Sequence, residues 1–165
     1  MDELLDVVNS RDNVIGSDFR SKVHSKNLFH RSAHILVFNY NYCLFLQKRS
    51  LNKDESPGLW DSSAAGHLNF EETYYACAIR ELREELGIKS LLTQILYIPA
   101  NLATFFEHTR VYKCITASEI KINLQEISEG RYWPLSEIKY SIQSHPDKFT
   151  STFHIIFNEY ISKIK

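Results

Sequence analysis

The sequence predicts a mixed α/β fold, in which a sheet of mixed strand direction is covered by helices. Two observations predict it. Strand-like runs rich in β-branched and aromatic residues lie on both sides of one long helical pattern, and two more helical patterns end the chain. The 165 residues contain no internal repeat and no low-complexity linker, which predicts a single domain over residues 1–165.

The first strands are predicted at HILVFNY (34–40) and CLFLQKRS (43–50), paired or joined as a hairpin across Asn41 and Tyr42. The second run ends in Gln47, Lys48 and Arg49, so its end is polar, as if it met a site. Later strands are predicted at QILYIPAN (94–101), TFFEHTRVYKCITA (104–117) and ISEGRYWPL (127–135).

The long helix is predicted from about residue 70 to 86. Asn69 and Glu72 have the spacing of a capping pair, and Gly87 is a natural stop. The spacing of the apolar residues indicates a buried stripe formed by Tyr75, Ile79, Leu82 and Leu86. Two further helices are predicted at residues 134–143 and 146–164; in the second, Pro146 occupies the first turn and the apolar periodicity indicates packing alone.

Composition excludes several classes of protein. Nineteen basic and 20 acidic residues give a net charge of −1, so no positive field attracts nucleic acid. No apolar run reaches the roughly 18 residues that span a bilayer, and the acidic start MDELLDVVNS differs from a signal peptide, so we expect a cytoplasmic protein without a membrane partner. Three widely spaced cysteines, Cys43, Cys77 and Cys114, indicate neither a disulfide framework nor a zinc site.

The long helix carries an unusual acidic face. Glu81, Glu84 and Glu85 stand at positions i, i+3 and i+4, so three like charges project together. Two interpretations are open on this evidence alone. Either Arg80 and Arg83 screen a solvated surface, or the carboxylates bind hard divalent cations, above all Mg²⁺.

The spacing of the whole stretch decides between them. GHLNFEETYYACAIRELREELGI (66–88) resembles the Nudix box, and every position of that motif is filled, by Gly66, Glu72, Arg80, Glu81, Leu82, Glu84, Glu85, Gly87 and Ile88. Seven of these are fixed identities, which coincide by chance in roughly one in 10⁹ placements at ordinary residue frequencies. The chain is therefore identified as similar to Nudix hydrolases.

The resemblance implies a fold, an activity and a cofactor. It implies an α/β/α sandwich with a mixed sheet, in which the box forms a loop, a helix and a loop, and hydrolysis of a nucleoside diphosphate linked to another group. Glu81, Glu84 and Glu85 correspond to the metal-binding glutamates, with the carbonyl of Gly66 as a further ligand. Glu72 and Arg80 correspond to the pair that braces them. The implied ion is Mg²⁺, with Mn²⁺ as the alternative.

Outside the box the chain is similar to the Nudix branch related to isopentenyl diphosphate isomerase, over nearly its whole length. In that enzyme a cysteine directly before the Gly-His of the box region transfers the proton, and here that residue is Ala65. A second acid of the isomerase, two residues after the counterpart of Glu107, is replaced by Thr109. These departures and the intact box favour a hydrolase.

The same branch holds a metal through histidines and a glutamate. The corresponding residues here are His24, His30, His67 and Glu107, which leaves open whether a second metal is bound. Glu107 is also our preferred base or additional ligand, over the loop residues Glu126 and Glu129.

Substrate contacts are expected from Arg49, Lys53 and His67, because basic residues at a strand end and in the following turn suit a diphosphate. Phe105, Phe106 and Tyr112 could stack a nucleobase, but strand alternation explains them equally well. Trp60 and Cys77 could also reach a site, and packing is the favoured interpretation of both.

The expected function is Mg²⁺-dependent hydrolysis of a diphosphate bond in a nucleoside diphosphate-linked or related small molecule, by a monomer or homodimer. Two alternatives remain at this point, an isopentenyl diphosphate isomerase-like enzyme and a non-catalytic nucleotide-binding module.

Overall fold

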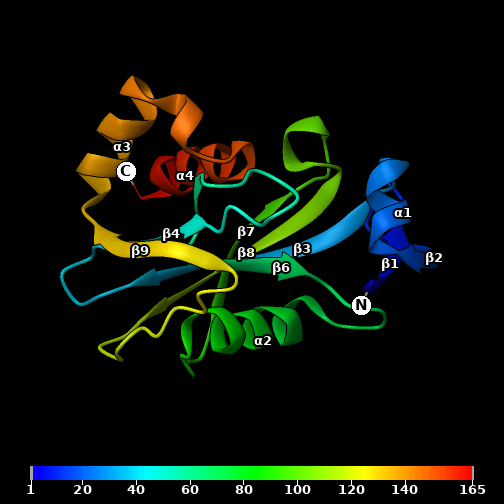
Figure 1. Cartoon of the computed structure of the whole chain (residues 1–165), viewed down its shortest axis with the longest axis horizontal. Coiled ribbons are helices and arrows are strands. Elements are labelled where there is room, and N and C mark those ends of the chain that lie inside the picture. Colours follow the sequence, from blue (N-terminus) through cyan, green and yellow to red (C-terminus); the bar gives the residue numbers. More distant parts are fainter. Residues whose placement is uncertain (1, 165) are drawn as a thin grey trace.

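The structure, a computed structural model, describes residues 2–164. A mixed sheet lies between α2 on one side and α3 with α4 on the other (Figure 1), which confirms the predicted α/β class and the helix-covered mixed sheet. In chain order the elements are β1 Leu4–Val8, β2 Val14–Phe19, α1 Arg20–Ser25, β3 His30–Phe38, β4 Leu44–Arg49, β5 Trp60–Asp61, β6 Ala64–His67, α2 Tyr74–Leu86, β7 Thr93–Ile98, η1 Leu102–Thr104, β8 Glu107–Ile115, β9 Ile127–Trp133, α3 Leu135–Ser144, η2 Pro146–Lys148 and α4 Ser151–Lys163.

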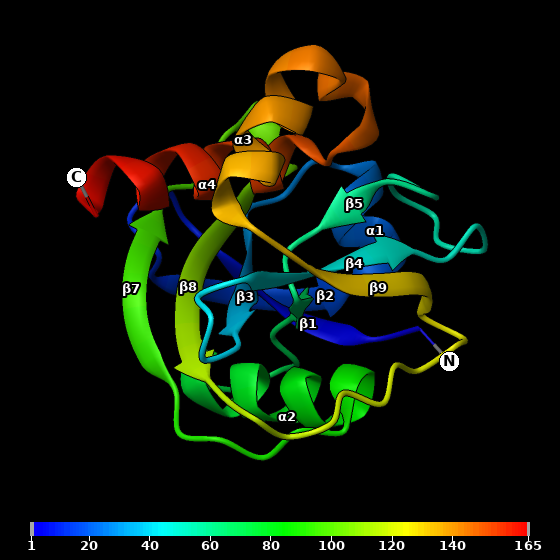
Figure 2. The ribbon, with the colours of Figure 1, turned by 90° about the vertical axis from the view of Figure 1, so that its left-hand side faces the viewer.

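The seven-stranded sheet runs in the order β5-β4-β3-β8-β7, with β6 added to β3 and β9 added to β4. β3 and β8 are parallel and the other pairs are antiparallel. β3 and β4 are registered at a single pair, Phe38 with Leu44, so the predicted pairing holds only where the two strands meet. Beyond that point they diverge, which opens the sheet on the side where β6 lies (Figure 2). A separate hairpin, β1–β2, flanks this sheet.

The long helix begins later than predicted. The residues from Asn69 to Glu72 form a turn, in which the Glu72 carboxylate accepts from the Asn69 N–H at 2.9 Å, and Glu71 has a left-handed φ of 60°. Thr73 then caps α2, its hydroxyl accepting from the Ala76 N–H. The predicted end is right, because Gly87 has a φ of 68° and closes the helix in the left-handed conformation.

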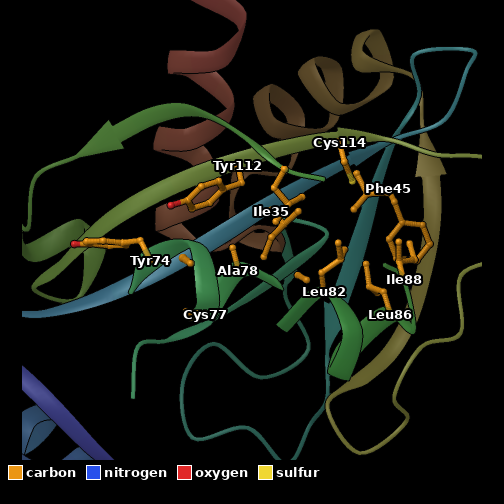
Figure 3. Packing of buried hydrophobic residues seen from close by; sticks show 14 of the residues in the cluster. Ile35, Phe45, Tyr74, Cys77, Ala78, Leu82, Leu86, Ile88, Tyr112 and Cys114 are labelled. Atoms are coloured by element: carbon orange, nitrogen blue, oxygen red, sulfur yellow. The ribbon is translucent and has the colours of Figure 1, made fainter. Parts of the chain in front are cut away.

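The predicted buried stripe of α2 is partly wrong, because the helix is rotated about its axis relative to the prediction and buries a different set of side chains. Leu82 and Leu86 are buried as expected, but Tyr75 is 42% exposed and Ile79 only partly buried. Instead Tyr74, Cys77 and Ala78 face the sheet (Figure 3). The rotation follows from Glu85, which points inward to hydrogen-bond partners on the strands, a constraint that apolar periodicity does not contain.

The opposite face of the sheet packs against α4. Leu36, Phe38 and Val111 of the strands meet apolar side chains of α4, among them Phe153 and Ile156. The predicted final helix is interrupted, because η2 ends at Lys148 and α4 starts at Ser151 after the cap Thr150. The Thr150 N–H bonds to the Trp60 carbonyl, which fixes this break against β5. Within residues 2–164 no helix combines the length and apolarity needed to cross a bilayer.

Candidate active site

β6 is the strand on which the candidate site is assembled. It pairs with β3 so that His67, Gly66 and Ala65 stand opposite Ser32, Ala33 and His34. Because side chains alternate along a strand, Gly66 faces α2 whereas Ala65 and His67 face the other way, toward α4. Ala65, Gly66 and His67 of this strand line a polar cavity of about 400 Å³, together with residues from both faces of the strand.

The acidic cluster lies on the α2 side. Glu81, Glu84 and Glu85 all line the cavity beside Gly66. A Cβ at Gly66 would come within 1.9 Å of the Glu81 carboxylate, so glycine is required by this close approach. Glu85 is 4% exposed and accepts hydrogen bonds from the Ala65 N–H at 3.0 Å and the Gln47 amide at 2.9 Å.

Arg80 holds the acidic cluster to the loop before α2. Its guanidinium donates to Glu72 at 2.8 and 2.9 Å and to Glu81 at 2.5 Å. A further bond reaches the carbonyl of His67 at 3.0 Å, and Glu84 lies at 3.4 Å. The predicted pairing of Glu72 with Arg80 is therefore present as a two-pronged ion pair.

Burial sets the protonation of these acids. It raises the pKa of Glu81 to about 7, and burial together with the charge of Glu81 raises the pKa of Glu85 to about 8. Burial opposes ionisation of Glu72 as well, but the Arg80 hydrogen bonds and the Asn69 N–H more than offset it and lower the pKa of Glu72. Glu81 and Glu85 thus place two carboxylates with raised pKa values close together. Their oxygens form an all-oxygen donor set that fits a divalent cation such as Mg²⁺.

A second cluster lies on the other side of β6. Ring nitrogens of His24, His30 and His67 lie within 4.8 Å of one another. The Nε2 atoms of His24 and His30 are buried and have no hydrogen-bond partner among the described residues. Their Nδ1 atoms are engaged elsewhere, with Glu55 at 2.6 Å and with the Leu28 carbonyl at 2.9 Å. Two orphaned nitrogens held in this way fit a metal that imidazole binds, such as Zn²⁺ or Mn²⁺.

Glu107 belongs to the histidine cluster. Its carboxylate lies 3.0 Å from His67 Nε2 and 3.6 Å from His30 Nε2. Although burial alone would raise it, the neighbouring His67 and His30 hold the pKa of Glu107 well below its ordinary value. Phe105 and Phe106, directly before Glu107, both have left-handed φ angles, of 52° and 63°, a strained turn of the kind found at functional sites.

The predicted phosphate-binding residues reach the same cavity. Arg49 lies 3.6 Å from Asp61 and donates from Nε to the Glu55 carbonyl at 3.0 Å. Lys53 forms an ion pair with Glu126, and both line the cavity.

Two other charged residues near Arg49, namely Lys48 and Glu129, do not line the cavity. Lys48 stacks on the Trp60 ring and lies 3.8 Å from Glu129, and neither Lys48 nor Glu129 is among the lining residues. Of the two loop acids considered earlier, Glu126 is therefore the one at the cavity.

Ala65 also lines the cavity, on the histidine side of β6. Its side chain is a methyl group, at the position that corresponds to the proton-transferring cysteine of the isomerase branch. Thr109, the other departure noted from the sequence, hydrogen-bonds to Ser32 at 2.9 Å and is fully buried.

Most of the aromatic and thiol candidates are packing residues. Trp60 and Tyr112 belong to the two hydrophobic cores. The Cys77 thiol donates to the Gly66 and His67 carbonyls at 3.5 and 3.4 Å, and burial raises its pKa, so it remains a thiol that supports the loop. Phe105 alone of these candidates lines the cavity.

Sequence reasoning missed several residues of the site. Glu55 orients His24 from the segment 51–58, where the sequence pointed to Lys53 alone. Gln47 binds Glu85, and the polar end of its strand was the one signal that pointed to it. His34 and Asp61, buried at the inner end of the cavity, carried no signal, because isolated polar residues within strands do not reveal which face they occupy.

Comparisons with known proteins agree on one family. A family model described as the NUDIX domain matches residues 28–153. An isopentenyl-diphosphate Delta-isomerase 2 of Photorhabdus laumondii is 36% identical over 164 residues, covering 96% of this chain and 92% of that protein. An uncharacterized Nudix hydrolase of Pseudomonas aeruginosa is 32% identical over 136 residues, covering 79% and 78%. A crystal structure from Deinococcus radiodurans has a TM-score of 0.85 at 23% identity and covers 95% of this chain and 98% of its own.

Proposed function

The chain belongs to the Nudix family, and from this membership we propose that it is a Mg²⁺-dependent hydrolase of a diphosphate bond in a nucleoside diphosphate-linked or related small molecule. One observation carries the proposal. The complete acidic cluster of the box faces the same cavity as Ala65, a residue that can neither donate nor accept a proton. The site thus holds the ligands for a hydrolytic cation but lacks the proton donor that an isomerase needs there.

The roles of the residues follow from their positions. Glu81, Glu84 and Glu85 would supply carboxylate oxygens for the ion, together with the Gly66 carbonyl. When bound, Mg²⁺ neutralises the diphosphate and makes a water a stronger nucleophile. Arg80 braces the cluster by its bonds to Glu72 and to the loop before α2.

Basic residues that line the cavity bind the substrate. Arg49 and Lys53 line the cavity as donors to the phosphate oxygens, and His67, a member of the histidine cluster, lines it too. Water attacks one phosphorus, the bridging P–O bond breaks, the leaving group departs with the bridging oxygen, and the proton that the water loses is released to solvent. We assign Glu107 as an additional metal ligand beside the histidines, in preference to Glu126, whose carboxylate is paired with Lys53.

The second candidate is an isopentenyl diphosphate isomerase-like enzyme. The relatives with that name and the histidine cluster with Glu107 favour it. Ala65 and Thr109 weigh against it, since each would have to be replaced in function by another group. A non-catalytic nucleotide-binding module is the third candidate, and the retention of every acid of the box weighs against that role.

A substrate panel tests the three candidates. Purified protein with Mg²⁺ is incubated with nucleotides, nucleotide sugars, dinucleotides and prenyl diphosphates, and the release of phosphate or nucleotide is measured. We expect hydrolysis that Glu84→Gln reduces at least a hundredfold in a protein that stays folded. Formation of dimethylallyl diphosphate from its isomer would establish the second candidate, and tight nucleotide binding without turnover in Mg²⁺ or Mn²⁺ would establish the third.

A further inference from the structure

Most of the ionisable side chains that line the cavity are already engaged. The acidic and histidine clusters account for one group of them, and acids of the rim pair with basic residues, as Asp54 does with Arg20 at 3.0 Å and Glu126 does with Lys53. His34 is different. It is 5% exposed, lines the inner end of the cavity and belongs to neither cluster. Its imidazole is therefore available for chemistry that the two clusters do not perform.

Hydrogen bonds fix the tautomer of the His34 ring. Its Nδ1 lies 2.6 Å from the Ser62 hydroxyl, and that hydroxyl donates to Asp61 Oδ1 at 3.4 Å, so Nδ1 carries the proton in this pair. Asp61 Oδ1 also accepts from the Ser62 N–H at 2.7 Å, which fixes the carboxylate. Nε2 then keeps its lone pair, and it makes no hydrogen bond with any residue of the described chain. A ring anchored through one nitrogen in this way presents the other as a base in one orientation.

The register of β3 and β6 places this nitrogen-bearing ring beside the rest of the site. His34 stands opposite Ala65, and paired residues of neighbouring strands point to the same face, so the imidazole lies next to the Ala65 methyl group. The Ala65 N–H donates to Glu85 at 3.0 Å, which puts the acidic cluster one residue away from the ring. Arg49, a donor for the phosphate oxygens, lies 3.6 Å from Asp61. The groups that hold the diphosphate therefore border His34 on two sides.

The charges around His34 keep its ring neutral, as a base requires. Burial lowers the pKa of His34, and Arg49 on β4 acts in the same direction, whereas Asp61 on β5 and Glu107 on β8 oppose the shift. On β6 the one ionisable residue is His67, and the part of α4 that lines the cavity has none. Once Nε2 accepts a proton, Asp61 Oδ1, 3.9 Å from Nδ1, stabilises the imidazolium. A neutral ring accepts a proton at Nε2 but has none to donate there, so it does not replace the missing proton donor of an isomerase.

We propose that His34 is the general base of the hydrolytic step. Nε2 removes a proton from the attacking water as the water oxygen bonds to phosphorus, and the bridging P–O bond breaks with its electron pair leaving on the bridging oxygen. The imidazolium, held through Ser62 toward Asp61, then releases the proton to solvent. This role rests on the proposed hydrolase function and assigns the group that accepts the proton of the water.

The first experiment compares the wild type with His34→Gln at saturating Mg²⁺, on the member of the substrate panel with the highest kcat/KM. We expect kcat to fall at least about a hundredfold and KM to change little, because a general base contributes about 10²–10⁴ to the rate. The wild-type kcat should rise with pH as His34 loses its proton, with an apparent pKa below its ordinary value of 6.5, and His34→Gln should lack this limb. His145→Gln, the same substitution at an exposed histidine, should match the wild type.

Chemical rescue distinguishes a base from a residue that only packs. His34→Ala leaves a hole of the size of the missing ring, and added imidazole should raise its kcat at least about tenfold. Pyrazole has the same shape but is a far weaker base, so it should not. Rescue by both azoles, or by neither, overturns the proposal. If His34→Ala or His34→Gln does not fold, the pH profile of His34→Asn, whose amide can still donate to Ser62, decides in its place.

The outcomes separate this role from the function on which it rests. A wild type that hydrolyses no member of the panel refutes the hydrolase and the base together. An active wild type beside a folded His34→Gln protein of undiminished kcat refutes the base alone. Nitrogen-15 NMR of histidine-labelled protein adds a measurement that does not depend on turnover: we expect His34 to carry its proton on Nδ1 at neutral pH, and a ring protonated on Nε2 overturns the proposal.

Discussion

Replacing Glu85 by glutamine should stabilise the metal-free protein while it abolishes activity. Glu85 is buried beside Glu81, and its pKa is raised from 4.5 to about 8. The unfolded chain therefore ionises this group at a lower pH than the folded protein does. Stability is lost progressively as the pH rises from about 4.5 to 8, because the folded state holds a proton that the unfolded state releases.

The size of the effect follows from that interval. At pH 7 the pH is about 2.5 units above the pKa of Glu85 in the unfolded chain but still below its pKa in the folded protein. Ionisation therefore favours the unfolded chain by roughly 3 kcal/mol. Glutamine removes this loss because it does not ionise. Its side-chain oxygen can still accept from the Ala65 N–H and the Gln47 amide, so the two hydrogen bonds at this position remain.

Urea unfolding in a metal chelator, followed by tryptophan fluorescence, measures the difference. The gain for Glu85→Gln should be about 3 kcal/mol at pH 7 and below about 1 kcal/mol at pH 5. The matched control is Glu84→Gln, which removes a half-exposed carboxylate of the same cluster. It should lose activity equally but change stability by less than about 0.5 kcal/mol. A Glu85→Gln protein that is less stable at pH 7, or equally stabilised at pH 5 and 8, would refute the reasoning.

Three further predictions concern the two clusters. Gly66→Ala should lose activity at least tenfold yet remain folded, because the new Cβ must displace the Glu81 side chain from Cγ outward but meets no backbone atom within the nearest contacts. Gly16→Ala has open space and should match the wild type in the same assay and melting curve. Glu55→Gln should weaken Zn²⁺ binding by about 10- to 100-fold in calorimetry, while Asp54→Asn, on the exposed side of the same loop, should not. Mg²⁺ should raise the melting temperature more at pH 8 than at pH 6, since the two buried carboxylates of the box must lose protons to bind it; an equal rise at both pH values would contradict the assignment.

The sequence was sufficient for the features that depend on local spacing. The strands later found at β3, β4, β7, β8 and β9 were predicted from runs of apolar residues, and the box was recognised because its identities lie within residues 66–88. The end of α2 was predicted for the same reason, since a glycine directly after Leu86 readily adopts the left-handed conformation that ends a helix.

Features that depend on long-range contacts were not predictable in this way. The rotation of α2 is set by hydrogen bonds between Glu85 and residues 20 and 38 positions away in the chain. Glu55 meets His24 across 31 positions, and nothing in the local pattern of either residue indicates the pairing. The short strands β5 and β6 form because β4 and β3 offer free edges, a tertiary condition that propensity does not express.

The acidic cluster and the histidine cluster differ in how far apart their candidate metal-binding residues lie along the chain. The acidic cluster draws on Gly66 of β6 and on one helical turn of α2, so its candidate ligands lie within residues 66 to 85. The histidine cluster requires α1, β3, β6 and β8 to meet, with ligands that span residues 24 to 107. An ion held by this cluster would bind most tightly to a chain in which these four elements have met, so its binding would stabilise that native arrangement over the unfolded chain.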